Sequence, residues 1–223
     1  MNAGWTGGGR EPIALAGRSS SAAAGTGRAR RAAVLLDRDG TLNELTADPD
    51  SGRPESPLAV GDVRLIEGAA DAAARLAAAE YALVCVSNQP AAAKNKATVG
   101  QLQAVHEQVL RLLARRGVEI ELSLLCLHHP EGSVAALSGA CECRKPAPGM
   151  LLQAAAALDL DLAASWMIGD TDTDVGAGHA AGCQTVLLDH LPSAHKRAGK
   201  ADPDERARDL ADAAKRLLGS GAA

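Results

Sequence analysis

Short apolar runs alternate with helical stretches along most of this chain, and no other feature of the sequence constrains the fold as strongly. The runs with the length and composition of buried strands are residues 32–36, 81–86, 118–127, 166–168 and 185–188. Helical patterns occupy residues 68–79, 98–117, 148–158, 175–181 and 204–218. Because strands and helices in this order form right-handed crossovers, we predict an α/β fold with helices on both faces of a mainly parallel sheet.

The first 31 residues do not follow this pattern. They are rich in Gly, Ala, Ser and Arg, and Glu11 is their only acid. A secretion signal would need an apolar stretch after the basic residues, but the run at 32–36 stops at Asp37, and no run approaches the roughly 20 residues of a membrane helix. We therefore predict a disordered leader over residues 1–31 (a misplaced start codon would explain the same composition), one domain over residues 32–220, and a cytoplasmic protein.

Composition narrows the choice of partners. The chain has 23 Lys and Arg against 27 Asp and Glu, a formal net charge of −4, and only 1% aromatic residues. Proteins that bind nucleic acid usually present a basic surface and aromatic faces on which bases stack. We therefore expect no nucleic-acid partner. We also expect no membrane partner, and a monomer.

The first of two acidic clusters follows the first apolar run, at a strand end where α/β sheets bind ligands. Asp37 and Asp39 stand two residues apart, and Gly40 then lets the chain turn away. The pair suits a nucleophile and a proton donor. An Asx-rich turn is the alternative interpretation.

The second acidic cluster, residues 169–174, follows the fourth apolar run and contains Asp170, Asp172 and Asp174. Carboxylates crowded at one strand end repel one another unless a cation lies among them, so the cluster favours a metal site. A solvated loop with a helix cap at Thr173 or Asp174 explains one of these acids but not the whole cluster.

Two polar residues between the acidic clusters suit phosphoryl oxygens. Ser87 begins a Ser-Asn-Gln segment directly after an apolar run and offers a hydroxyl donor, and Lys145, within Arg-Lys-Pro, offers a point charge. Either residue alone would be unremarkable on a surface. Together with Asp37, Asp39 and Asp170 they supply a nucleophile, an acid, a metal site and two phosphoryl-oxygen ligands.

These segments, in this order from Asp37 to Asp174, resemble the four motifs of the haloacid dehalogenase (HAD) superfamily over about residues 34–188. The resemblance implies a Rossmann-like three-layer α/β/α sandwich that hydrolyses phosphomonoesters through an aspartyl-phosphate. The implied catalytic residues are Asp37 as nucleophile, Asp39 as general acid and base, and Ser87 and Lys145 as phosphoryl ligands.

The same resemblance implies a Mg²⁺ site. The carboxylates of Asp37 and Asp170 and the main-chain carbonyl of Asp39 would hold the ion. Asp174 would support the metal shell or orient the catalytic lysine. Asp172 has no role in the family pattern, and we expect a solvated loop residue there.

The cysteines predict a second metal site. Three of the five lie in one short segment with a histidine, which favours metal over disulfides in a chain without an export signal. Cys126, His128, Cys141 and Cys143 form a Cys₃His set, a composition typical of structural Zn²⁺. A metal-free thiol-rich loop and a strained Cys141–Cys143 disulfide are the alternatives. We expect His129 to neighbour the site without binding the ion.

The zinc loop, about residues 126–143, and the Arg-Lys-Pro after it are similar to the zinc loop of the D-glycero-D-manno-heptose-1,7-bisphosphate 7-phosphatase family. Histidinol-phosphate phosphatases share this plan, usually with a shorter gap between the ligand pairs. The motif spacing leaves no room for a separate cap domain, as in capless members of the superfamily. The resemblance implies a Mg²⁺-dependent phosphatase for a small sugar phosphate, with Asn88 and Arg144 as substrate contacts.

Two segments depart from that family. Residues 90–96 replace the Ser-Gly and later Arg-Gly that usually follow Ser-Asn-Gln, and Thr171 stands where Lys is common. Lys94 is either a substitute substrate ligand or a solvated lysine. Because both departures lie where substrate should bind, histidinol-phosphate phosphatase is the alternative activity. A catalytically silent zinc-bearing binding module is the alternative outside enzymes.

Overall fold

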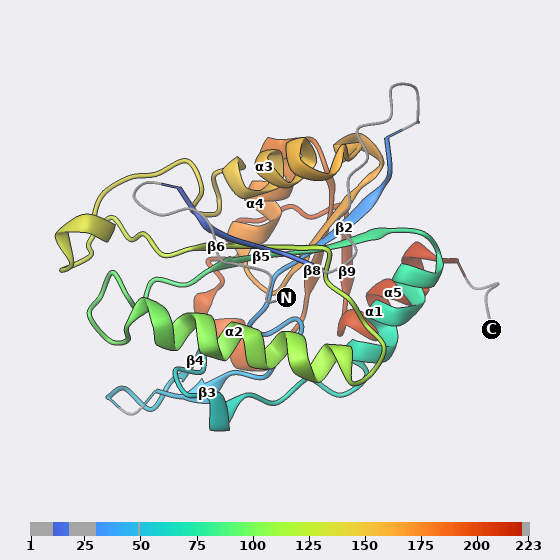
Figure 1. Cartoon of the computed structure of the whole chain (residues 1–223). Helices are drawn as coiled ribbons and strands as arrows, with labels where there is room; N and C mark the ends of the chain where they lie inside the picture. The colour runs from blue at the N-terminus through green and yellow to red at the C-terminus, as the bar shows by residue number, and fades with distance from the viewer. Residues whose placement is uncertain (1–10, 18–29, 49, 220–223) are drawn as a thin grey trace.

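A computed structural model describes residues 11–17, 30–48 and 50–219, which fold around one seven-stranded sheet (Figure 1). The strand order is β1 (Ile13–Ala16), β6 (Leu122–Cys126), β5 (Ala82–Asn88), β2 (Ala33–Leu36), β7 (Trp166–Gly169), β8 (Gln184–Leu188) and β9 (Glu205–Ala207). Neighbouring strands are parallel except β1, which pairs antiparallel with β6. The predicted mainly parallel sheet is confirmed.

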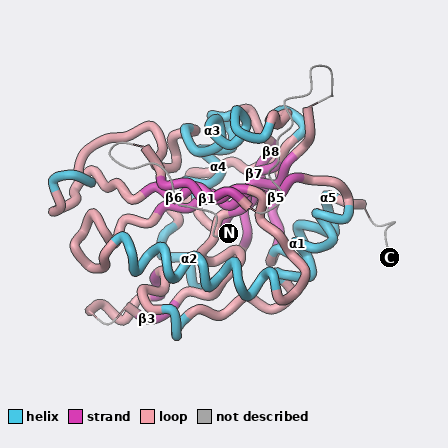
Figure 2. Tube along the Cα trace, viewed as in Figure 1, coloured by secondary structure: helices cyan, strands magenta, loops and turns pink. Residues whose placement is uncertain are grey.

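Helices cover both faces of the sheet, which confirms the predicted three-layer α/β/α sandwich (Figures 1 and 2). One face carries α3 (Gly149–Leu158) and α4 (Asp172–Ala181), and the other carries α1 (Ala69–Ala78), α2 (Val99–Ala114) and α5 (Leu210–Leu217). The shorter elements are the hairpin of β3 (Thr46–Ala47) and β4 (Pro54–Glu55) and the 3-10 helices η1 (Val60–Asp62), η2 (Ala135–Leu137), η3 (Leu162–Ala164) and η4 (Leu191–Lys196). Across the residues described, the helices are all too short or too polar to cross a membrane.

Side-chain signals in the sequence fix where two helices begin. At α2, Thr98 Oγ1 accepts a hydrogen bond from the Gln101 main-chain N–H (3.2 Å), and Gln101 Oε1 accepts one from the Thr98 N–H (2.8 Å). Thr171 and Asp174 form the same reciprocal capping box at α4. That helix therefore begins at Asp172, earlier than the residues 175–181 we expected, and its cap is Thr171 rather than Thr173 or Asp174.

Strand β2 shows why the sheet needs helices on both sides. Val34 and Leu36 pack with α1 and α5, whereas Ala33 and Leu35 pack with α3 and α4. All four side chains are fully buried. A strand whose residues are apolar on both faces is stable only in the centre of such a sandwich.

The central position of β2 also determines where the site lies. From β2 the sheet extends through β5 and β6 to one side and through β7, β8 and β9 to the other. The main-chain N–H of Asp37 donates to the carbonyl of Ile168 at 2.9 Å, so the ends of β2 and β7 are joined there. Open α/β sheets bind ligands at such a reversal of strand order, beyond the carboxyl ends of the strands.

The two chain ends differ from expectation. Ile13–Ala16 forms β1, inside the segment 1–31 that we predicted as a disordered leader, because Ile13 and Leu15 are buried against β6. For residues 1–10 and 18–29 that prediction lies outside the described residues. The helix expected over 204–218 was predicted too long. Its first part is β9, which pairs with β8, and α5 begins only after Asp209, whose side chain accepts from the Asp212 N–H.

Candidate active site and metal centres

Asp37, the predicted nucleophile, follows β2 and is buried at the end of the sheet. Lys145 donates from Nζ to Asp37 Oδ1 at 2.7 Å. Burial raises the pKa of Asp37 to about 7; the charge of Lys145 opposes this shift, and the carboxylates of Asp174 and Asp170 add to it. A carboxylate this costly to ionise needs further positive charge beside it.

Lys145 comes from the loop before α3 and is held by three acceptors. Its Nζ lies 2.7 Å from Asp37 Oδ1, 2.6 Å from Asp174 Oδ1 and 2.7 Å from the Val86 carbonyl. Burial alone would lower the pKa of Lys145, but the carboxylates of Asp174 and Asp37 raise it above its ordinary value. The ammonium therefore stays charged at the point where a phosphoryl group would contact Asp37.

Asn88 also serves Lys145. We expected Asn88 to contact substrate, and it does line the cavity. Its side-chain amide, however, donates to the Lys145 carbonyl at 3.0 Å and accepts from the Lys145 N–H at 3.1 Å. These two bonds fix the main chain of the lysine against β5.

Three carboxylates could hold a divalent cation: two that we predicted as ligands, Asp37 and Asp170, and one that we predicted in a supporting role, Asp174. Oxygen atoms of Asp37, Asp170 and Asp174 lie within 4.8 Å of one another, and all three residues are buried. Asp170 Oδ1 accepts no hydrogen bond from any described residue, although it is inaccessible to solvent. Three buried carboxylates against the single ammonium of Lys145 leave a negative site, and hard oxygen ligands of this kind suit Mg²⁺.

Asp174 makes contacts that separate its two predicted roles. Its Oδ1 pairs with Lys145, while its Oδ2 accepts from the Thr171 N–H (3.0 Å) and Oγ1 (2.6 Å). Both oxygens thus have protein partners. The geometry therefore favours the role of orienting Lys145 over that of holding the metal shell.

Asp39, the predicted general acid and base, lies in a cradle of side-chain donors. Arg38 donates from Nε to Oδ1 (3.0 Å) and from Nη2 to Oδ2 (2.8 Å). Asn43 donates to Oδ1 at 2.8 Å, and Gln89 donates to Oδ2 at 2.6 Å. Burial raises the pKa of Asp39. The charge of Arg38 and the hydrogen bonds from Arg38, Asn43 and Gln89 lower it by more, so the pKa lies below its ordinary value.

These groups open into one cavity of about 350 Å³. Ser87 lies at its base, with Oγ accepting from Gln89 Nε2 at 2.9 Å. The predicted residues that line the cavity are Asp37, Asp39, Ser87, Asn88, Lys94, Arg144, Lys145, Asp170 and Asp174. The structure therefore brings together every residue that we assigned to the catalytic, Mg²⁺ and substrate sites.

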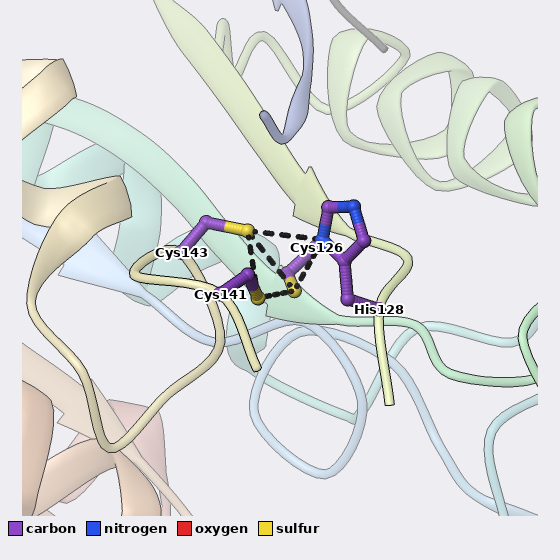
Figure 3. Close-up of side chains that lie close together, drawn as sticks. All are labelled: Cys126, His128, Cys141 and Cys143. Carbon is purple, nitrogen blue, oxygen red and sulfur yellow. Dashed lines mark hydrogen bonds between the residues drawn. The ribbon is translucent and has the colours of Figure 1, made fainter. Parts of the chain in front are cut away.

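The cysteine cluster lies beside this cavity, after β6. Cys126, His128, Cys141 and Cys143 point toward a common centre (Figure 3). Their sulfur atoms are 3.3 to 3.7 Å apart, and His128 Nδ1 lies 3.3 Å from Cys143 Sγ and 3.6 Å from Cys126 Sγ. Tetrahedral zinc with bonds of about 2.3 Å places thiolate sulfurs roughly 3.8 Å apart, close to this spacing.

The cluster also resolves two alternatives from the sequence. All of its cysteines are free thiols, so the Cys141–Cys143 disulfide is absent from the described structure. Of the adjacent histidines, His128 lies in the cluster, whereas His129 Nδ1 accepts from the Glu131 N–H at 3.1 Å. Hydrogen bonding from Cys143 lowers the pKa of Cys126 to about 5, which favours the thiolate that zinc binds.

Comparison with known proteins identifies the family. A sequence model of the HAD-hydrolase-like family matches residues 142–213. D-glycero-beta-D-manno-heptose-1,7-bisphosphate 7-phosphatase of Yersinia pestis is 40% identical to the chain over 185 residues, which cover 83% of this chain and 94% of that protein. The chain belongs to the HAD-like hydrolases. The enzyme of the same name from Escherichia coli (strain K12) is 40% identical over 156 residues, or 70% of this chain and 78% of that protein.

A solved structure supports the metal assignment of this HAD hydrolase. D,D-heptose 1,7-bisphosphate phosphatase from B. bronchiseptica, complexed with magnesium and phosphate, aligns with a TM-score of 0.68 and 30% identity over 84% of this chain and 98% of that one. The chain is a phosphatase of this family. Its carboxylate triad fits Mg²⁺, and its Cys₃His cluster fits Zn²⁺.

Sequence reasoning missed the cradle around Asp39 in this HAD hydrolase. Arg38 and Gln89 both lie inside recognised motifs, so the signal was present, but an arginine between two aspartates reads as a solvated residue. In the structure Arg38 is completely buried. Asp172 was also misjudged: it is the first residue of α4 rather than a solvated loop residue, and its Oδ2 accepts from the Ala198 N–H at 2.7 Å.

Sequence reasoning also missed the ion pairs between two lysines and the acids of the β3–β4 hairpin. Lys96 lies 3.0 Å from Asp48 and 3.3 Å from Asp50, and Lys196 lies 2.8 Å from Glu55. Both lysines line the cavity. Only the folded chain could show these pairs, since their partners are far apart in sequence.

We expect Cys141→Ser to lose zinc while wild-type protein carries one zinc per chain, because a hydroxyl is a poor substitute for thiolate. Activity should fall because the zinc loop becomes disordered. Arg144, which lines the cavity, donates from Nη1 to the His128 carbonyl of that loop at 3.2 Å and would lose this support. Elemental analysis of freshly purified protein measures this, with Cys183→Ser, a buried thiol outside the cluster, as control. Wild-type protein without zinc would refute the assignment.

Proposed function

We propose that this chain removes the 7-phosphate from D-glycero-beta-D-manno-heptose 1,7-bisphosphate. The observation that carries the proposal is the 40% identity to enzymes of that activity across most of the chain, in a protein whose hydrolytic groups all line one cavity. A catalytically silent binding module would have no need for Asp37, Asp39, Ser87, Lys145 and Asp170 around one cavity.

The groups divide between two chemical steps. An Asp37 carboxylate oxygen bonds to phosphorus as the bond from phosphorus to O7 of the sugar breaks, and a proton goes from Asp39 to O7. Because the cradle lowers the pKa of Asp39, this residue must take up a proton from solvent before the step. Water then bonds to phosphorus as the bond from phosphorus to the Asp37 oxygen breaks, which releases phosphate and restores the Asp37 carboxylate, and Asp39 takes a proton from that water. Ser87 and Lys145 hold the phosphoryl oxygens, and Asp174 keeps Lys145 in position through the 2.6 Å pair.

The carboxylates of Asp37 and Asp170 and the main-chain carbonyl of Asp39 would hold Mg²⁺ in this proposal. When bound, the ion supplies positive charge that neutralises the phosphoryl group and the attacking carboxylate. Burial, with the nearby carboxylates, raises the pKa of Asp37 to about 7, and a cation held beside it would favour the ionised nucleophile.

Two other cations that line the cavity suit the distal 1-phosphate. Arg144 and Lys94 both line the cavity, and neither forms an ion pair with another described residue. Lys96 and Lys196, by contrast, are already paired with acids of the hairpin. Arg144 is therefore the leading candidate to contact the distal 1-phosphate, and Lys94 is the next candidate.

We expect the 1,7-bisphosphate to exceed the 7-monophosphate in kcat/KM by roughly 10- to 150-fold, the equivalent of a charged hydrogen bond worth about 1.5–3 kcal/mol. Arg144→Ala should narrow this ratio toward one, and Arg115→Ala, an exposed arginine at the end of α2, should leave it unchanged. Phosphorus NMR of the product should show that the 7-phosphate leaves. Release of the 1-phosphate, or equal rates on both substrates, would contradict the proposal.

A further inference from the structure

The carboxylate of Asp170 is held on one oxygen only. Ser193 Oγ donates to Asp170 Oδ2, while Oδ1 is buried and accepts no hydrogen bond from the described part of the chain. Ser193 is fully buried and lies on η4, which follows β8. Since β8 is the parallel neighbour of β7, the turn after β8 reaches the acid that follows β7.

The main chain of Gly40 packs against the same oxygen, Asp170 Oδ2. A Cβ at this position would overlap Asp170 Oδ2 and would lie 2.9 Å from Ser193 Oγ. The φ of Gly40 is +90°, which glycine adopts without strain. Asp170 Oδ2 thus lies between the main chain of Gly40 and the Ser193 hydroxyl, and the rotation of the carboxylate is restricted.

His190 in turn fixes the hydroxyl of Ser193. Its Nδ1 lies 2.7 Å from Ser193 Oγ. A serine hydroxyl has one proton, and Ser193 gives it to Asp170, so the Nδ1 of His190 must carry a hydrogen and donate to Oγ. Glu44 lies on the far side of the ring, 3.9 Å from Nε2.

We propose that Ser193 and His190 are positioning residues for the divalent cation: together they hold Oδ2 of Asp170 so that Oδ1 is presented to the metal. Neither residue lines the cavity, so neither contacts substrate. The inference rests on the Mg²⁺ site of the proposed function. Partners that orient metal ligands typically change metal affinity by about 10- to 100-fold when removed.

The test is metal binding by the chelator-treated protein, without substrate. Mn²⁺ serves as the probe because it accepts the same oxygen ligands as Mg²⁺, and electron paramagnetic resonance measures the free ion. We expect the Kd for Mn²⁺ to rise about 10-fold in Ser193→Ala and about threefold in His190→Ala. His190→Asn keeps a donor near the position of Nδ1 and should restore binding. At saturating Mg²⁺, kcat should recover while the KM for Mg²⁺ stays raised.

Ser123→Ala is the matched control. Ser123 is a buried serine on β6, and its hydroxyl has no hydrogen-bond partner among the described residues. Its Kd for Mn²⁺ should equal that of wild type. Wild-type affinity in both Ser193→Ala and His190→Ala, or absence of Mn²⁺ binding by wild type, would overturn the inference. If the heptose substrate fails but Ser193→Ala still weakens Mn²⁺ binding, only the proposed function is wrong.

Discussion

Replacing Asp37 with Asn lowers kcat by roughly 10³- to 10⁶-fold, the range expected when a covalent nucleophile is lost. An amide oxygen has almost the shape of the carboxylate oxygen but lacks the charge and nucleophilicity to attack phosphorus. The fold should survive, because Asn fills the same volume and removes a carboxylate that burial makes costly to ionise. Phosphate release and thermal unfolding measure the two effects separately.

The matched control is Asp172→Asn, an acid at the first position of α4 that does not line the cavity. Its Oδ2 contact with the Ala198 N–H can be kept by the amide oxygen. We expect its kcat to stay within about twofold of wild type, as is usual for a change outside the reacting groups. Near-normal turnover by Asp37→Asn would exclude an aspartyl-phosphate on that residue.

Asp39→Asn should lower kcat/KM on a sugar phosphate by about 10²- to 10⁴-fold, the usual contribution of a general acid or base. The loss of kcat/KM, which reports formation of the phosphoenzyme, should be far smaller on an aryl phosphate, whose leaving group departs without a proton. Because the second step also needs Asp39 to take a proton from water, phosphoenzyme should accumulate with the aryl substrate. Intact-protein mass spectrometry detects this added phosphoryl group.

The comparison of leaving groups separates proton transfer from structural damage. The Asn side chain would face Arg38 and Gln89 with one of its own donors, so some loss of packing is expected in any case. Damage to the cradle alone would reduce activity on both substrates alike. An equal loss of kcat/KM on aryl and sugar phosphates would therefore contradict the assignment of Asp39 as general acid.

The parallel sheet and its catalytic edge were predictable because they depend on local signals. An apolar run followed directly by Asp37, Ser87 or Asp170 places polar groups at the ends of neighbouring parallel strands, whatever the details of packing. The cluster of Cys126, His128, Cys141 and Cys143 was predictable for a similar reason, since Cys₃His is a closed ligand set for zinc.

Contacts between distant segments were not predictable. Ser193 lies 23 residues from Asp170, and Lys96 lies 48 residues from Asp48; neither pair follows a sequence spacing. The last helix was predicted too long because residues 205–207 have a helical composition, but pairing with β8 makes them a strand. Tertiary contacts overrode local preference there.

The most direct test of the account is kcat/KM for D-glycero-beta-D-manno-heptose 1,7-bisphosphate against kcat/KM for histidinol phosphate, measured on one preparation with saturating Mg²⁺. Arg144 and Lys94 line the cavity, have no ion-pair partner among the described residues and bind the second phosphate in the proposed function. We therefore expect the bisphosphate to be favoured by at least about 10-fold, the value of one charge-assisted contact. A higher kcat/KM for histidinol phosphate would contradict the proposed function and assign the chain to the amino-alcohol phosphate instead.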